Sequence, residues 1–521
     1  MLAEKTHPTS GAHERHLASG AVAQQLTLAI GTLTMLAVVT VLGRSLSLSE
    51  FGVYGLLVSI PGYMLIAQSS VEIAAIRAMA QADGQESRDR ALTTALALYA
   101  CFGLVAALGI VLVGWALLGV FDISTALRSD ARLGLGLLGL INLAGWPAKT
   151  AQDVLRGSQR FVSAALAEAV GYVTFGAAMA AAILLGAPLW AIAGLGGSLP
   201  LLIGMAAIVI LQRLRLPYRV RPSTFSLHYS RAFLSISGYL FVTGIADLVI
   251  YSFDRAILGA FRPVSSVGLY EGPIRAHNLI RQLQGTLALT VMPAAAGYVA
   301  SGDHVRLRDL LVRGTRYVML VTVPLTVTLM VLSGPILHVW LGPRFAPAAP
   351  AMTILVSYWL VGASSSVGGS MLIAVGRTRL VAIFISCVAA LSLALSLALT
   401  PPLGLNGVVL GTSIPNLLLA PVIIRVYCQT FDVPVRSLLR EAFMPAYASA
   451  AALALIELGG RLLLGANRVP MLLAIVAVAL GIYTAIVYRL CLRPRERMLI
   501  RNVLSGARRF IAPGRPSYRA L

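Results

Sequence analysis

Four polar residues recur at helical spacing within an otherwise apolar stretch of the chain, between residues 266 and 300. They are Glu271, Arg275, Asn278 and Gln282. At about 100° of rotation per residue, this spacing places all four within roughly 60° of arc on one helix face. A guanidinium fork grips phosphate oxygens, and amide side chains hydrogen-bond hydroxyl groups. The stripe is therefore suited to a molecule that carries both phosphate and hydroxyl groups.

Further charged and amide residues lie in other apolar stretches and are candidates to line the same cavity. A charge in hydrocarbon costs about 2.5–3.5 kcal/mol on insertion scales, so such residues normally face a bundle interior or a water-filled cavity. We predict that the substrate is bound by Arg275, Arg281, Arg255, Asn278, Gln282, Gln24 and Gln68. We predict that counter-charge or ion coupling is provided by Glu271, Asp247, Asp254 and Glu72.

The charged residues also have a purely structural interpretation. Glu271 and Arg275 are four residues apart, so they can form an ion pair along one helix. Asp247, Asp254 and Arg255 can instead hold two neighbouring helices together. The sequence leaves both interpretations open for these residues.

The composition requires helices that cross a membrane. Of the 521 residues, 58% are apolar and 12% are charged, whereas a soluble domain has about 45–50% apolar and about 25% charged residues. A spanning helix needs about 20 mostly apolar residues. Fourteen stretches qualify, and we predict an all-α polytopic membrane protein with helices at 18–43, 51–76, 91–121, 131–150, 161–186, 189–212, 232–261, 266–300, 313–341, 347–375, 379–400, 404–427, 442–464 and 468–490.

The basic residues predict which side of the membrane each loop occupies. The formal net charge of +21 comes from 41 basic and 20 acidic residues. With the fourteen segments in place, 31 of the 41 basic residues fall in one set of alternate loops and termini, and seven fall in the other. Short cytoplasmic loops are enriched in Lys and Arg. We therefore expect both termini in the cytoplasm and assign the excess charge to orientation and to anionic lipid, not to nucleic acid.

An internal repeat divides the chain. The pattern L-G-x8-G-x-Y begins at Leu42 and again at Leu258, an offset of 216 residues, and LRGSQRF at Leu155 resembles AVGRTRL at Ala374. Such a repeat indicates a duplicated six-helix unit of one orientation, as in parallel transporter repeats. We predict a cytoplasmic N-terminus (1–17), an N-lobe (18–212), a linker (213–231), a C-lobe (232–427), two extra helices (428–490) and a basic cytoplasmic tail (491–521).

The loops argue against an enzyme. Those on the predicted outer side are about ten residues or fewer, and the longest hydrophilic stretch is the basic tail, so no extramembrane catalytic domain is expected. His277 is expected to be a hydrogen-bonded neighbour of the polar stripe, not a catalytic base. Four cysteines without a CxxC spacing indicate neither a disulfide framework nor a metal site. We predict no catalytic residue, metal or cofactor.

The segments FDRAILGAFRPVSSVGLYEGPIRA and LGRSLSLSEFGVYGLLVSI resemble those of the oligosaccharide flippases, the Wzx-like polysaccharide transport proteins of the multidrug/oligosaccharidyl-lipid/polysaccharide exporter (MOP) superfamily. The resemblance covers the whole chain through its two six-helix lobes. It implies a V-shaped bundle whose central cavity opens alternately to either side. It also implies transport of an undecaprenyl-diphosphate-linked sugar to the periplasmic leaflet, as in exopolysaccharide, capsule or O-antigen (lipopolysaccharide) synthesis. Arg275 stands where related lipid II flippases carry a cavity arginine on their eighth helix.

The first predicted helix differs from that of two branches of the superfamily, which bears on the identity of the substrate. Residues 18–43 contain no arginine, unlike the first helix of lipid II flippases, and no carboxylate, unlike that of the drug exporters. The alternatives are a lipid II or drug exporter of the same superfamily, and a membrane enzyme of the same pathway such as a polymerase, ligase or acyltransferase.

The expected partners are a lipid-linked oligosaccharide, a proton or sodium ion, anionic lipids, and a polysaccharide polymerase with its co-polymerase in the bacterial inner membrane.

Overall fold

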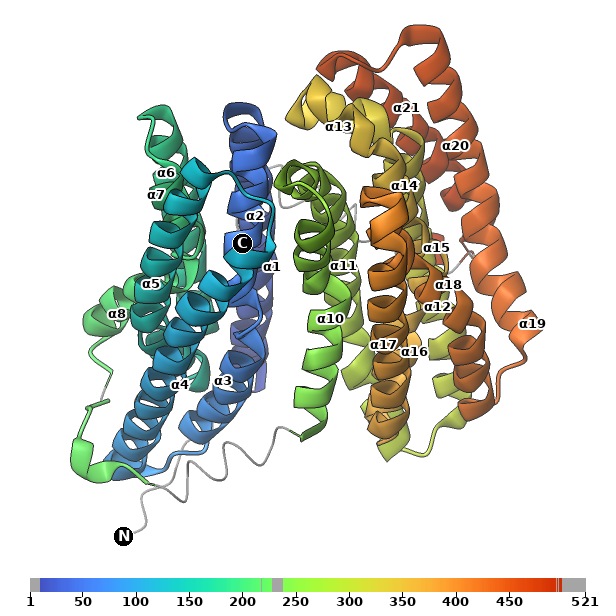
Figure 1. Cartoon of the computed structure of the whole chain (residues 1–521). Coiled ribbons are helices and arrows are strands. Elements are labelled where there is room, and N and C mark those ends of the chain that lie inside the picture. The colour runs from blue at the N-terminus through green and yellow to red at the C-terminus, as the bar shows by residue number, and fades with distance from the viewer. Residues whose placement is uncertain (1–9, 217, 227–237, 493, 495, 499–521) are drawn as a thin grey trace, which may run out of the picture. The chain divides into compact units, whose positions relative to one another are not determined.

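The computed structural model describes residues 10–216, 218–226, 238–492, 494 and 496–498, and within these ranges it contains helices and no strand (Figure 1). Most of the predicted N-terminal segment (1–17) and of the basic tail (491–521) lies outside the described residues, as does part of the linker (213–231). The fold class predicted from composition is confirmed: the chain is an all-helical, multi-pass membrane protein.

The predicted segments coincide with helices or with short runs of helices. The first part of the chain forms α1 (Ser10–Ser45), α2 (Leu48–Gly62), α3 (Leu65–Ala80), α4 (Gly84–Val120), α5 (Thr125–Gly157), α6 (Phe161–Leu184), α7 (Leu189–Gly196) and α8 (Leu199–Leu214). The remainder forms α10 (Gly238–Phe261), α11 (Val264–Ala300), α12 (His304–Val331), α13 (Ser333–Leu341), α14 (Ala349–Ser357), α15 (Trp359–Gly362), α16 (Ser364–Ala374), α17 (Thr378–Leu403), α18 (Leu405–Thr430), α19 (Val435–Leu438), α20 (Met444–Leu464) and α21 (Val469–Ile486).

Several predicted spans are broken. The segment 51–76 divides into α2 and α3 after Pro61, which removes a backbone donor from the helix. The segment 189–212 bends by 56° between α7 and α8. Among the described residues, ten helices are long and apolar enough to cross a membrane, or eleven if the bent pair is one span. This number is compatible with the predicted fourteen, which stays a prediction.

The start of α2 is fixed by local chemistry. The Ser47 hydroxyl accepts a hydrogen bond from the Glu50 backbone N–H at 3.2 Å, and the Glu50 carboxylate accepts one from the Ser47 N–H at 2.8 Å. This reciprocal capping box satisfies two amide groups that a helix start otherwise leaves without partners.

By compactness the chain divides into two units. One comprises 1–279, 337–358 and 376–419, and the other comprises 280–336, 359–375 and 420–521. In the first unit, α4 packs along α5, α1 along α6, α5 against α8, and α10 along α17. In the second, α12 packs along α20, and α20 along α21. This division does not follow the predicted N- and C-lobes, which stay a prediction.

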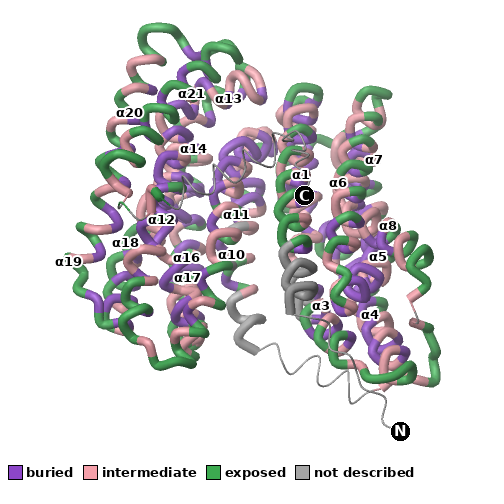
Figure 2. The backbone as a smooth tube through the Cα atoms, turned by 180° about the vertical axis from the view of Figure 1, so that it is seen from behind, coloured by how far each residue is buried: buried purple, intermediate pink, exposed green. Residues whose placement is uncertain are grey.

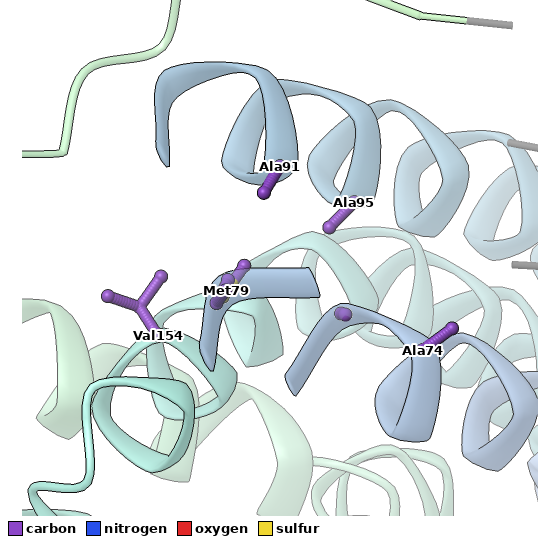
Figure 3. Packing of buried hydrophobic residues seen from close by; sticks show 6 residues of the cluster. Ala74, Met79, Ala91, Ala95 and Val154 are labelled. Carbon is purple, nitrogen blue, oxygen red and sulfur yellow. The ribbon is translucent and has the colours of Figure 1, made fainter. Parts of the chain in front are cut away.

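Small side chains let the helices of the first unit approach closely. One buried cluster joins α3, α4 and α5 and consists of Ala74, Ala75, Met79, Ala91, Ala95 and Val154 (Figure 3). Interfaces between membrane helices are enriched in small residues for this reason. Leu104, Leu108 and Leu112 on the opposite face of α4 are 49–63% accessible. Exposed residues alternate with buried ones along α4 (Figure 2). An exposed apolar ridge of this kind suits contact with lipid.

The sequence repeat recurs in the crossing of α2 and α11. A Cβ atom added to Gly52 would meet the Val264 carbonyl oxygen, and one added to Gly268 would meet the Leu48 carbonyl oxygen. Leu48 and Val264 are separated by the same 216 residues as Gly52 and Gly268. The two helices therefore touch through equivalent positions of the two repeats, and glycine is needed at both.

A second link between the repeats is a reciprocal exchange of arginines between α1 and the end of α13. Arg44 in the last turn of α1 donates to the carbonyl oxygens of Val339, at 2.5 Å, and Trp340, at 3.1 Å. Arg344 donates in return to the carbonyl oxygens of Gly43 and Leu46. The last carbonyls of a helix have no partner within it and carry partial negative charge. Arg44 thus binds carbonyl groups at the end of α13, and Arg344, in the turn that follows α13, binds carbonyl groups at the end of α1.

Candidate functional site

The Glu271 carboxylate lies between two arginines contributed by α10 and α11. Arg255 Nε is 2.5 Å from Oε1, and its Nη2 is 3.3 Å from Oε2. Arg275 donates to Oε2 through Nη2 at 3.2 Å and Nε at 3.3 Å. The i,i+4 ion pair considered from the sequence is therefore present, and Arg255 extends it to a triad. We call these residues the Arg255–Glu271–Arg275 triad.

The triad carries one more positive charge than negative. The Glu271 side chain is 0% exposed and that of Arg255 is 11% exposed, whereas that of Arg275 is 26% exposed. A guanidinium has five N–H donors, and Arg275 uses only Nε and Nη2 on Glu271. Arg275 is therefore the member that can also donate to an anion from outside, while Glu271 and Arg255 hold it in place.

A glycine makes room for the central carboxylate. A Cβ atom added to Gly55 on α2 would lie 2.5 Å from Glu271 Oε1. Gly55 and Glu271 are separated by the repeat offset of 216 residues. The two repeats thus carry a glycine and a glutamate at equivalent positions, and the absence of a side chain at Gly55 leaves room for the Glu271 carboxylate.

Asp254 has different partners from those of its neighbour Arg255. Its carboxylate accepts hydrogen bonds from the Tyr270 hydroxyl at 2.7 Å and from the Thr412 hydroxyl at 3.0 and 3.1 Å. The residue is 3% exposed. Asp254 therefore ties α10 to α11 and α18, which agrees with the structural interpretation of this residue.

The remaining predicted residues of α10 and α11 differ in exposure. Asn278 is half-buried, and its side-chain carbonyl oxygen accepts no hydrogen bond from the described residues. Arg281, Gln282 and Asp247 are exposed. His277 is fully buried and its Nε2 lies 2.5 Å from the Tyr358 hydroxyl. The structure thus gives His277 a hydrogen-bonded neighbour, as the sequence predicts.

A second network of charges surrounds Glu72 on α3. Lys149 Nζ lies 2.8 Å from its Oε2, and Arg156 Nη1 lies 2.5 Å from its Oε1. Both cations lie on α5. Lys149 also meets the Asp153 carboxylate at 3.3 Å, which in turn accepts a 2.6 Å hydrogen bond from the Tyr99 hydroxyl. Glu72 is therefore a bridging counter-charge and not an isolated carboxylate.

The network extends to α1 and α6. Arg156 Nη2 lies 3.3 Å from the Glu168 carboxylate, which also accepts a 3.4 Å hydrogen bond from Gln24 Nε2. Gln24 and Glu72, predicted separately, thus belong to one network. Gln68, one turn before Glu72, is 4% exposed and its amide nitrogen has no partner among the described residues.

Sequence reasoning missed the two cations of this network. The predicted helix 131–150 ends before Arg156, whereas α5 continues to Gly157. Their spacing with Asp153, at i, i+4 and i+7, was the available signal, because it places all three on one helix face. In the part of the chain that the structure describes, no group of three or more His, Cys, Asp or Glu side chains is placed to hold a metal ion.

Comparisons with known proteins agree with this architecture. A family model described as polysaccharide biosynthesis protein matches residues 41–350. The uncharacterized membrane protein EpsK of Bacillus subtilis is 26% identical over 203 residues, which are 39% of this chain and 40% of EpsK. The match therefore spans well under half of that relative.

Solved transporters share the fold. The lipid II flippase MurJ in an inward closed conformation superposes with a TM-score of 0.68 at 15% identity, over 90% of this chain and 98% of MurJ. An inward-facing multidrug resistance MATE family transporter of the MOP superfamily gives 0.67 at 14% identity, over 81% and 99% of the two chains. At this identity the likeness establishes the fold of the chain, and its cargo has to be argued from its own residues.

Proposed function

Since the chain belongs to the polysaccharide biosynthesis protein family, we propose that it is a flippase for a polyprenyl-diphosphate-linked oligosaccharide. Its place would be the bacterial inner membrane with both termini in the cytoplasm. The substrate would pass by alternating access from the cytoplasmic to the periplasmic leaflet during synthesis of an exopolysaccharide, capsule or O-antigen.

The Arg255–Glu271–Arg275 triad is the observation that carries this proposal. The diphosphate and glycan of such a lipid cannot cross hydrocarbon unaided, so a transporter has to offer positive charge and hydrogen bonds inside the membrane. The triad on α10 and α11 offers one excess positive charge, with Arg275 partly exposed. Asn278 adds a carbonyl oxygen free to accept from a sugar hydroxyl. Arg275 would hold the diphosphate, with Arg281, Gln282, Gln24 and Gln68 as further contacts.

The carboxylates would set the strength and reversibility of binding. Glu271 neutralises one of the two arginines, so a diphosphate would meet a modest positive charge from which it can also be released. Glu72, Asp247 and Asp254 are candidates for ion coupling, with a proton or sodium ion as the coupled species. A polysaccharide polymerase and co-polymerase would take up the product on the outer side.

A deletion strain complemented with variants tests the proposal. Arg275→Ala is expected to stop polymer export while the protein still reaches the membrane in normal amount. Single lipid-linked repeat units should then accumulate on the cytoplasmic side. The matched control is Arg306→Ala, because Arg306 is an exposed arginine that forms an ion pair with nearby Asp303. It should export normally.

Two results count against the flippase. Normal export by a well-folded Arg275→Ala protein removes the role proposed for that arginine. Accumulation of repeat units on the periplasmic side of the deletion strain instead indicates the polymerase alternative, since a polymerase acts after translocation.

A further inference from the structure

A partly open cavity of about 350 Å³ lies between α4, α5 and α8, and its lining residues include no member of either charged network. Most of its wall is apolar, including Leu92, Leu96, Ala151, Val154, Ile208 and Leu211. Its volume falls within the range of pockets that hold small molecules, about 300–1,000 Å³. Its lining therefore suits a hydrocarbon chain.

One polar group inside the cavity has no partner. Thr150 lines the wall and is 2% exposed, and its hydroxyl forms no hydrogen bond with the described residues. A buried polar group without a partner is unfavourable. An amphipathic ligand with an oxygen near its hydrocarbon chain would satisfy the hydroxyl.

The rim of the cavity is strongly basic. Arg215 lines it, and Arg213, Arg219 and Arg221 lie within six residues along the chain, all of them exposed. Within the described part of the chain, Arg221 is the one of these four that forms an ion pair, with Asp89 at 3.4 Å. An apolar cavity beside exposed guanidinium groups matches a ligand with a hydrocarbon tail and an anionic head.

The basic segment is held in place against α4. The Arg219 backbone N–H donates to the Asp89 carboxylate at 2.9 Å, and the Arg221 N–H donates to the Thr93 hydroxyl at 3.1 Å. The Tyr218 hydroxyl lies 3.0 Å from Ser158 Oγ. Because side chains of α4 and α5 fix this backbone, the rim is an ordered part of the site.

We propose that this cavity binds one anionic phospholipid, with an acyl chain among α4, α5 and α8 and its phosphate on Arg215. The segment 213–231 belongs to the arginine-rich loops that the charge distribution assigns to the cytoplasm. Anionic lipids are abundant in that leaflet, and basic pockets between membrane helices bind their head groups. The site is separate from the translocation residues and does not depend on the identity of the cargo.

The full chain, purified in detergent, tests the proposal by native mass spectrometry with added phosphatidylglycerol or phosphatidylcholine. The wild-type protein is expected to retain about one phosphatidylglycerol more firmly than phosphatidylcholine. Arg215→Gln should weaken that retention about 5-fold, which corresponds to the roughly 1 kcal/mol of one basic residue near a lipid phosphate. Leu96→Trp, which fills the cavity from a half-buried position, should abolish it.

Two controls separate the site from general lipid contact. Arg306→Gln removes an exposed arginine elsewhere and should leave retention unchanged. Both cavity variants should elute and melt as folded protein when no lipid is added. Equal retention of the two lipids, or unchanged retention in Arg215→Gln and Leu96→Trp, would overturn the proposal. So would a bound mass that corresponds to a polyprenyl diphosphate.

Discussion

Variants of the Arg255–Glu271–Arg275 triad can separate a loss of protein stability from a loss of transport. Glu271→Gln removes the negative charge that lies between Arg255 and Arg275, and leaves the nearly buried Arg255 guanidinium without a carboxylate. Removing one partner of a buried ion pair costs about 3–5 kcal/mol. Arg275→Gln removes only the 26% exposed member and leaves the Arg255–Glu271 pair intact. After screening by solvent, its cost should be about 0.5–1 kcal/mol.

The purified variants can be ranked by thermal melting of the full chain in one detergent. Glu271→Gln should melt well below the wild type, and Arg275→Gln should lie close to it. The control Glu86→Gln breaks an exposed i,i+4 pair with Arg90 and should melt as the wild type does. The double variant Arg255→Met/Glu271→Leu should recover much of the lost stability, because an apolar pair can replace a buried ion pair.

Two outcomes would refute this reasoning. If Glu271→Gln is as stable as the wild type, the carboxylate does not balance a buried charge. If Arg275→Gln melts as low as Glu271→Gln, Arg275 is a structural member of the triad and loses its assignment to the substrate.

Three further predictions follow from contacts in the first unit. Gly55→Ala places a Cβ against the Glu271 carboxylate and should reduce export at least 10-fold, whereas Gly62→Ala, which meets nothing within 4 Å, should export normally in the same complementation assay. Arg344→Ala removes two hydrogen bonds to the end of α1. A cysteine placed in that helix end should then react faster with a membrane-impermeant thiol reagent. An unchanged reaction rate would contradict the proposed role of Arg344 in holding this helix end. Glu72→Gln removes the charge of the carboxylate that bridges Lys149 and Arg156 and should lower the melting temperature. A melting temperature like that of the wild type would show that the network is dispensable.

Much of the helical architecture follows from the sequence, because the membrane imposes long apolar segments. The breaks within those segments are harder to predict, since Pro61 interrupts its helix whereas α5 continues through Pro147. Neighbouring helices decide whether the carbonyl freed by a proline finds another partner. Sequence alone does not supply that information.

The candidate site was predictable where its partners share one helix. Glu271 and Arg275 are four residues apart, so helical spacing found their pair. Asp254 is different, because its partner Thr412 lies 158 residues away and only the packing of α18 brings the hydroxyl to it. Arg156 was missed because the predicted helix ends at residue 150, whereas α5 continues to Gly157.

Movement of the substrate itself tests the central claim most directly. The purified protein, reconstituted in vesicles, would be supplied with a fluorescent polyprenyl-diphosphate oligosaccharide, and the fraction protected from a membrane-impermeant quencher would be followed with time. The account predicts that wild-type protein equilibrates the lipid between leaflets far faster than empty vesicles, and that Arg275→Ala protein behaves as empty vesicles do. Wild-type protein that leaves the lipid in its original leaflet, or Arg275→Ala protein that moves it at the wild-type rate, would contradict the account.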